Sequence, residues 1–217
     1  MERKLKALIL CIFIALPVFP HSLGITLSYE NDVMHGNGYS VGVIGRVGDF
    51  DVLFQNSFED LMLSLEYADT LDNTFAYDLY SYYWHSLKDE GGFMTLGFSI
   101  GQDFFIYRPL YMRYRLGGEF SFSYSDYSPR FHPIAFSPAA LFALGLSFER
   151  VSAEIYLTGS TFFRRSFQAL PIFGARGDWM VDEHNALSFD FNISIADYLG
   201  RFDVSRISFR AAYEYVF

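Results

Sequence analysis

Polar residues that could hold a lipid headgroup gather near the start of the chain. Asn31 and Asp32 are adjacent, and Ser40 follows a glycine-rich stretch. At the outer ends of adjacent strands, an amide, a carboxylate and a hydroxyl would converge on one place. His132 could then serve as a general base if it lay within hydrogen-bond reach. The simpler interpretation is that this segment forms a loop, because Asn, Asp and Gly are preferred turn residues.

The same segment resembles the opening of the outer-membrane lipid A deacylase family. Asn31 and Asp32 match the Asn-Asp pair on that family's first strand, and Ser40 stands where the family has threonine. The segments 100–103 and 113–117 are also reminiscent of it. The resemblance implies a twelve-stranded barrel that removes an ester-linked acyl chain from lipid A with the help of calcium. It also implies a histidine base near the outer rim, for which His132 is the best positional match. The chain departs from the family in being shorter, with a truncated loop around His132.

No other residues suggest a metal site or a cofactor. His35, His85 and His184 do not have the spacing of metal ligands. The only cysteine, Cys11, falls within an expected leader, so the mature chain would contain neither disulfides nor cysteine-ligated metals. Metal ligands therefore stay unknown, and we expect no cofactor unless the deacylase-like alternative, with its calcium, applies.

The first 24 residues have the three parts of a secretory signal peptide. Arg3, Lys4 and Lys6 form a positive start, and the apolar stretch at 7–18 is too short to span a bilayer. Small residues at Ser22 and Gly24 provide a cleavage site. We therefore expect a signal peptide at 1–24 and a barrel domain at 25–217. The alternative for the leader is a single membrane anchor.

The composition favours a membrane-exposed β-structure. The chain is 51% apolar and 20% aromatic but only 19% charged, which is unusual for a soluble domain. A lipid-facing β surface with aromatic girdles uses Phe and Tyr freely. The net charge of −9 leaves no basic footprint, which excludes nucleic acid as a partner.

Residues alternate between apolar and polar along most of the chain, which is the period of a strand. The segment 187–195 places five apolar residues on one face, and 207–217 repeats the pattern up to the last residue. The polar face carries charges of both signs: Arg113, Arg115, Glu119, Glu154, Arg176, Asp178, Asp190, Arg206, Arg210 and Glu214. A soluble sandwich also alternates, but a transmembrane barrel turns its polar face to the lumen, where Arg–carboxylate pairs fit. We therefore predict an all-β, transmembrane, antiparallel up-and-down β-barrel in the bacterial outer membrane.

The end of the chain supports this prediction. Phe217 closes an alternating strand, with Tyr215 two residues earlier and Arg210 at the start of the last eight. This arrangement resembles the terminal signal read by the outer-membrane barrel assembly machinery, although Ala212 stands where that signal usually has glycine. We expect that machinery and outer-membrane lipid to be the partners of the chain.

Twelve strands are favoured, and merging weak segments would give eight or ten. The expected strands are 25–31, 39–47, 51–56, 60–68, 75–85, 93–107, 110–124, 138–149, 151–163, 168–181, 185–196 and 204–217. With both ends in the periplasm, the loop at 125–137, which contains His132, falls outside the cell.

Three functions are compatible with these patterns. The first is a non-enzymatic small barrel, either a narrow channel or a structural or surface protein. The second is a deacylase-like hydrolase acting on acylated envelope lipid at the outer rim of the barrel, with Asn31, Asp32, Ser40 and His132 as its site. The third is a secreted soluble β-sandwich. The first is the prediction, and lipid mass analysis would separate it from the second.

Overall fold

The computed structural model describes residues 20–32, 36–47, 50–57, 60–71, 75–87, 91–125, 128–159, 171–198 and 201–217. These residues form twelve antiparallel strands in one closed barrel, each strand hydrogen-bonded to the next along the chain. The strands are β1 (Pro20–Asp32), β2 (Gly36–Val47), β3 (Phe50–Asn56), β4 (Asp60–Leu71), β5 (Phe75–Ser86), β6 (Gly91–Tyr107), β7 (Leu110–Ser125), β8 (Ser128–Ser147), β9 (Val151–Gly159), β10 (Pro171–Met180), β11 (Asn185–Tyr198) and β12 (Arg201–Val216). Within the described ranges, no helix has the length and apolar character needed to cross a membrane.

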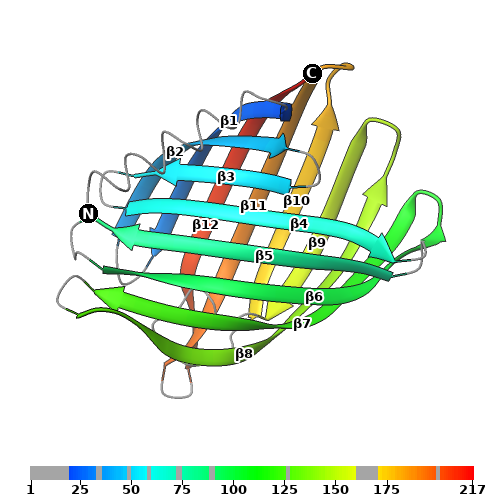
Figure 1. Cartoon of the computed structure of the whole chain (residues 1–217). Helices are drawn as coiled ribbons and strands as arrows, with labels where there is room; N and C mark the ends of the chain where they lie inside the picture. Colours follow the sequence, from blue (N-terminus) through cyan, green and yellow to red (C-terminus); the bar gives the residue numbers. More distant parts are fainter. Residues whose placement is uncertain are drawn as a thin grey trace.

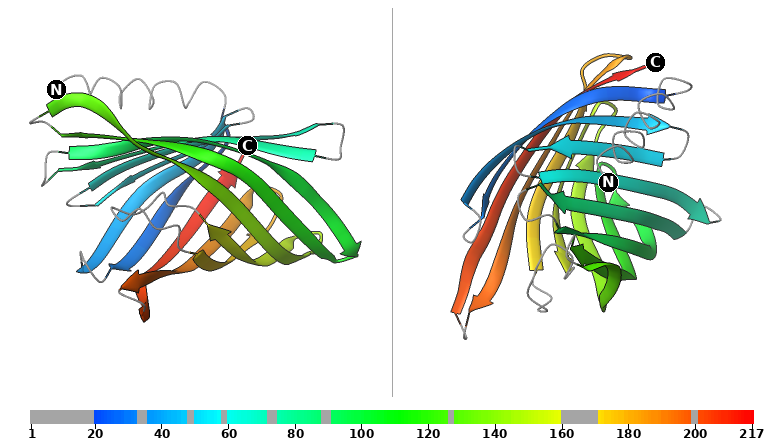
Figure 2. Two further views of the ribbon diagram at one scale, coloured as in Figure 1. Left: turned by 90° about the horizontal axis from the view of Figure 1, so that it is seen from below. Right: turned by 60° about the vertical axis from the view of Figure 1, so that its left-hand side comes forward.

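The barrel closes where its first and last strands meet. β1 and β12 pair continuously from Ser22 opposite Val216 to Asp32 opposite Arg206. The amide of Phe217 extends this ladder by donating to the carbonyl of His21 at 3.0 Å. The two strands, blue and red, run side by side in every view of Figures 1 and 2. The all-β up-and-down barrel and its twelve strands are therefore confirmed.

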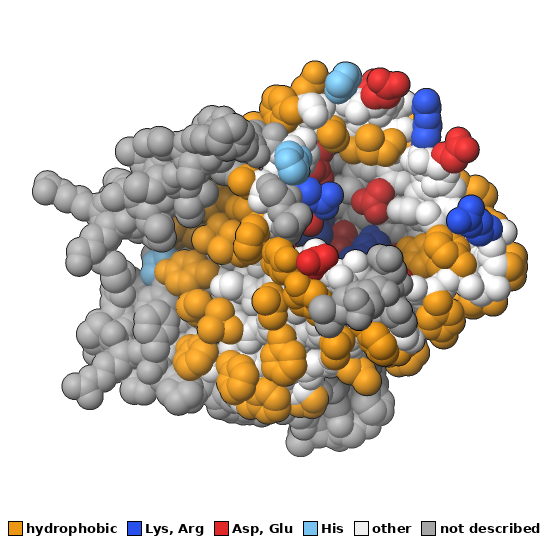
Figure 3. Space-filling view, turned by 45° about the vertical axis from the view of Figure 1, so that its right-hand side comes forward, with side chains coloured by type: hydrophobic (Ala, Val, Ile, Leu, Met, Phe, Trp, Pro, Cys, Tyr) orange, Lys and Arg blue, Asp and Glu red, His pale blue; other side chains and the backbone are white. Residues whose placement is uncertain are grey.

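In contrast to a soluble protein, this barrel exposes apolar side chains on its outer surface and buries polar ones. On β1, Ile25 and Leu27 are 60% and 59% exposed, whereas Thr26 between them is completely buried. Thr95 on β6 is likewise buried, whereas the next residue, Leu96, is 42% exposed. Figure 3 shows hydrophobic side chains over the outer surface of the barrel. Such a continuous apolar surface is unfavourable in water but favourable against lipid, so the alternation reflects a lipid-facing exterior and a polar lumen.

Aromatic side chains gather at both ends of this apolar surface. Tyr29 and Tyr39 lie 5.1 Å apart between ring centroids near the end of β1 that carries Asp32. At the opposite end, Tyr67 lies 5.1 Å from Phe50 and 5.9 Å from Tyr77. Aromatic rings prefer the two interfaces of a membrane, and these clusters therefore mark the borders of the lipid-facing belt. We take the end of the barrel where β1 begins and β12 ends as the periplasmic end.

The turn between β10 and β11 is held by one carboxylate. Asp182 accepts hydrogen bonds from the backbone amides of His184 and Asn185 at 2.8 and 2.9 Å, and from the Asn185 side chain at 2.8 Å. The His184 amide, followed by the Asn185 side chain, lowers the pKa of Asp182 below its usual value. The ionised aspartate thus fixes the register with which β11 returns along β10.

Placing a charge in the lipid belt provides a direct test of this orientation. Ile155 lies in the middle of β9 and is 63% exposed. Ile155→Arg should lower the free energy of unfolding by about 2–4 kcal/mol, the cost of Arg on the lipid face near the bilayer midplane. Phe148→Arg, at the turn after β8, should cost only about 0–1 kcal/mol, since it lies near the interface. Urea titration of both variants in lipid vesicles measures the difference, and equal costs would contradict this orientation.

The largest differences from the predicted strand boundaries are at the starts of β8 and β1. The segment 125–137 was expected to be a loop, but β8 begins at Ser128, and His132 lies within it opposite Ser123 of β7. That expectation was wrong, because pairing with the long strand β7 extends β8 through this stretch. β1 begins at Pro20, and Ser22 donates a hydrogen bond to Glu214 at 2.9 Å. Cleavage after Gly24 stays a prediction, and it would remove this bond.

Candidate functional site

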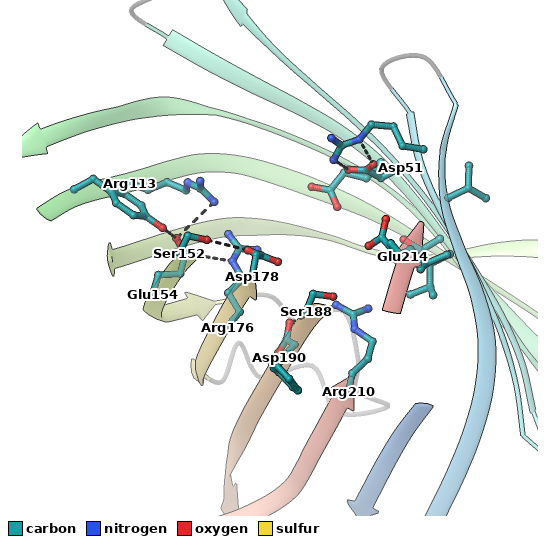
Figure 4. A pocket seen from close by; sticks show the side chains of 18 residues that line it. Asp51, Arg113, Ser152, Glu154, Arg176, Asp178, Ser188, Asp190, Arg210 and Glu214 are labelled. Atoms are coloured by element: carbon teal, nitrogen blue, oxygen red, sulfur yellow. Dashed lines mark hydrogen bonds and ion pairs between the residues drawn. The ribbon is translucent and has the colours of Figure 1, made fainter. Parts of the chain in front are cut away.

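The polar faces of the strands line a cavity of about 380 Å³ inside the barrel. Figure 3 looks into the hollow, where acidic and basic side chains lie together, and Figure 4 shows them from close by. The charged lining residues are Arg46, Asp51, Glu66, Arg113, Glu154, Arg176, Asp178, Asp190, Arg210 and Glu214. They come from β2, β3, β4, β7 and β9 to β12, so only closure of the sheet brings them together. The sequence predicted that Arg113, Glu154, Arg176, Asp178, Asp190, Arg210 and Glu214 face the lumen. All seven line the cavity, so this prediction is confirmed for them.

Ion pairs form a chain along the wall from β5 to β7. Arg115 of β7 is 7% exposed and contacts Asp78 of β5 at 3.0 Å and Asp103 of β6 at 2.5 Å. Arg113, two residues earlier on the same face, contacts Asp103 at 3.2 Å. Ser99 of β6 also donates to Asp78 at 2.8 Å. Arg115 therefore joins carboxylates from two different strands, an arrangement that suits its long, planar guanidinium fork.

Glu154 of β9 continues the chain and is its most enclosed member. Its side chain is 3% exposed and lies 2.5 Å from the guanidinium of Arg176 and 3.7 Å from that of Arg113. Tyr111 adds a hydrogen bond from its hydroxyl at 2.6 Å. Two cations and a hydroxyl thus surround one buried carboxylate, which balances the cost of removing its charge from water.

Three lumenal tyrosines each cross a glycine to reach a carboxylate two strands away. Tyr80 lies over Gly97 and donates to Glu119 at 2.6 Å; the other two bridges run from Tyr111 over Gly145 to Glu154, and from Tyr156 over Gly174 to Asp190. A Cβ atom at any of the three glycines would lie 2.1–2.5 Å from the tyrosine ring. The glycines are therefore required so that the rings can lie flat on the wall and leave the lumen open.

Gln55 of β3 makes a similar bridge on the other side of the barrel. Its amide donates to Thr26 at 3.1 Å and to Ser28 at 2.6 Å on β1, passing over Gly42 of β2. The lumenal wall is thus cross-linked by hydrogen bonds beyond its backbone ladder in two separate regions.

The last two strands add further pairs. Arg210 of β12 contacts Asp190 of β11 at 3.4 Å, and the hydroxyl of Tyr156 donates to the same aspartate at 2.9 Å. Arg206 of β12 contacts Glu30 of β1 at 2.5 Å across the seam where the barrel closes. Arg–carboxylate pairing inside the lumen, expected from the sequence, is therefore confirmed.

Three carboxylates of the cavity have no arginine within ion-pair distance among the described residues. They are Glu66, Asp178 and Glu214. Asp178 accepts a hydrogen bond from Ser152 at 3.1 Å, and Glu214 accepts one from Ser22. The hydroxyls orient these carboxylates without neutralising them.

Aromatic rings line the lumen nearer its outer end. Tyr82, Trp84 and Phe93 point inward from β5 and β6, on the same face as the buried Thr95. Phe93 stacks on Tyr82 at 5.8 Å and on Trp84 at 5.3 Å between ring centroids. These rings lie on the lumenal side of the wall, outside the lining of the charged cavity.

The residues predicted for chemistry at the outer rim are not assembled into one site by the described part of the chain. Asn31 lies on the outer face with Leu27, and its side chain donates a hydrogen bond to Asn37. Ser40 lies on the lumenal face with Gly42, opposite Ser28. The side chains of Asp32 and His132 lie outside the described residues. No group of three or more His, Cys, Asp or Glu able to hold a metal ion occurs within the described ranges.

Several lumenal residues were not singled out from the sequence. They are Glu30, Asp51, Glu66, Asp78 and the three bridging tyrosines. The acids could have been identified from the sequence, because each occupies a polar position in the alternation of its strand. The tyrosines gave no such signal, because aromatic residues were expected on the lipid face.

No protein-family model matches the chain, and no curated protein is similar to it in sequence. Solved structures share its fold. A KdgM porin in complex with disordered oligogalacturonate is similar with a TM-score of 0.55 at 8% identity, covering 90% of this chain and 99% of that one. The NanC porin has a TM-score of 0.52 at 12% identity, covering 90% and 100%. A bacterial polysaccharide outer-membrane secretin has a TM-score of 0.51 at 9% identity, covering 90% and 98%.

These similarities concern the fold. Together with the apolar outer surface, they identify an outer-membrane β-barrel of bacteria, as the sequence predicted. They give no support to the resemblance to lipid A deacylases.

Proposed function

We propose that the chain is a narrow, non-enzymatic channel of the bacterial outer membrane through which small polar solutes diffuse. The observation that carries this proposal is the cavity of about 380 Å³ within the barrel, whose lining is dominated by charged side chains. A lumen that served only as a structural core would be filled by packed side chains, as it is in smaller barrels. Here the ion pairs and flat tyrosine rings hold polar groups against the wall.

The porins with a similar fold support this proposal. KdgM is described as a porin that binds oligogalacturonate, and NanC is also described as a porin. The ring cluster of Tyr82, Trp84 and Phe93 would act as the narrowest part of the passage and limit solute size. The closing strand that ends at Phe217 would be the segment read by the barrel assembly machinery.

Swelling of proteoliposomes loaded with the purified protein tests the channel and its size limit. Monosaccharides should enter and cause swelling, whereas trisaccharides should enter poorly. The double variant Trp84→Ala with Phe93→Ala should admit the larger sugars, because it removes two stacked rings from the lumen.

A matched control removes two rings from the lipid face. Phe98 and Phe120 are 45% and 48% exposed on the outer surface, so Phe98→Ala with Phe120→Ala should leave the size limit unchanged. Absence of swelling with every solute, for protein whose folding is verified by heat-modifiable gel mobility, would exclude the channel.

A further inference from the structure

We infer that the channel prefers small cations to anions, and that Glu66, Asp178 and Glu214 set this preference. The inference rests on the proposed channel function and adds the class of solute. It concerns the electrostatic potential of the cavity, since no metal site is present among the described residues.

The first step is the balance of charge around the cavity. Among the described residues, six carboxylates and four arginines line it. A confined lumen with low-dielectric walls focuses the field of its lining charges, and rings of carboxylates favour cations in channels. An excess of carboxylates therefore raises the local concentration of cations.

The second step is the pairing of the arginines. Arg46 contacts Asp51 at 2.6 Å, Arg176 contacts Glu154 at 2.5 Å, and Arg210 contacts Asp190 at 3.4 Å. Arg113 is likewise held by Asp103 and Glu154. Each of the four described arginines of the cavity is thus compensated by a carboxylate at contact distance, and none of these four presents an isolated positive charge to an anion.

The third step is the set of carboxylates that remain. Glu66, Asp178 and Glu214 lie on β4, β10 and β12, so they surround the cavity rather than forming one cluster. Figure 4 shows Asp178 and Glu214 on different sides of the space. Glu66 also lies opposite Asp51 in the register of β3 and β4, which places two acids side by side. A small cation would meet uncompensated negative charge from several directions.

The test is the reversal potential of the purified protein in planar bilayers under a KCl gradient at low ionic strength, where screening is weak. For the native protein, the potential should have the sign set by K⁺. In the triple variant Glu66→Gln, Asp178→Asn, Glu214→Gln, three carboxylates remain against four arginines. These arginines stay paired with Asp51, Asp103, Glu154 and Asp190, so its potential should fall close to zero.

Two controls separate charge at these positions from shape and from charge elsewhere. The variant Glu66→Asp, Asp178→Glu, Glu214→Asp keeps all three charges, so its reversal potential should keep the sign set by K⁺. Glu149→Gln with Glu183→Gln removes two charges from the exposed turns after β8 and β10 and should also retain it.

Each outcome is decisive. If the native protein conducts current but its reversal potential is zero or has the sign set by Cl⁻, the inference is overturned while the channel function stays intact. A triple variant that keeps the native potential would overturn the assignment of the three residues. No current in native, folded protein would overturn the channel function itself and the inference with it.

Discussion

Replacing Glu154 by alanine is expected to lower the free energy of unfolding of the barrel by about 3 kcal/mol. This is the lower end of the cost of breaking a buried ion pair from one side, because the side chain of Arg176 is 37% exposed. The Glu154 side chain is 3% exposed and accepts contacts from Arg176, Arg113 and Tyr111. Its loss would leave the Arg176 guanidinium in the lumenal wall without its contacting carboxylate. Urea unfolding of refolded protein in lipid vesicles measures the change.

Two comparisons make this prediction specific. Glu154→Leu with Arg176→Met removes both charges and should recover most of the lost stability, because replacing a buried pair by apolar groups is often neutral. Asp51→Ala breaks the pair with Arg46, whose side chains are 46% and 58% exposed, and should cost at most about 1 kcal/mol. Equal losses in the Glu154 and Asp51 variants would contradict the role of burial.

Replacing Gly117 by alanine is expected to cost more than about 4 kcal/mol or to prevent folding, a size of effect that marks a specific structural conflict. A Cβ atom at this position on β7 would lie 1.8 Å from the carbonyl oxygen of Phe98 and 2.7 Å from the Cα of Ser99 on β6. Both atoms belong to the backbone, so no side-chain rotation relieves the overlap, and the β6–β7 ladder would have to separate.

Gly38→Ala is the matched control, because no atom lies within 4 Å of the position that its Cβ would take. Its effect should stay within about 0.5 kcal/mol, as for most surface substitutions. The fraction of each variant that shows heat-modifiable mobility after refolding reports the difference. Normal folding of the Gly117 variant would show that the two strands do not approach so closely.

Much of the barrel could be predicted because its strands reveal their two faces in the sequence. In β11 and β12 the apolar residues follow one parity and the charged residues the other, and the structure keeps this arrangement. Parity alone also placed Arg113, Glu154 and Arg210 in the lumen. The pairing of these charges could not be predicted, because contacts such as Arg115 with Asp78 span two strands and depend on the register of β5, β6 and β7.

Sequence patterns predicted some segments poorly, and the structure shows the reason for each. Tyr80 of β5 faces the lumen, where it bridges Gly97 to reach Glu119, so aromatic residues occupy both faces of that strand and obscure its alternation. The start of β8 contains Pro133 and Pro138, which suggested a loop, yet it pairs with β7 through two register shifts. At the rim, Asn31 and Ser40 face opposite sides because of the β1–β2 register, which composition does not reveal.

Single-channel recording of the native protein in planar bilayers tests the central claim most directly. If the charged cavity belongs to a continuous passage narrowed by Tyr82, Trp84 and Phe93, the recordings should show discrete steps of small conductance, and the Trp84→Ala, Phe93→Ala variant should show larger ones. Folded, membrane-inserted protein that gives no steps, with the variant equally silent, would contradict the claim that this barrel is a channel.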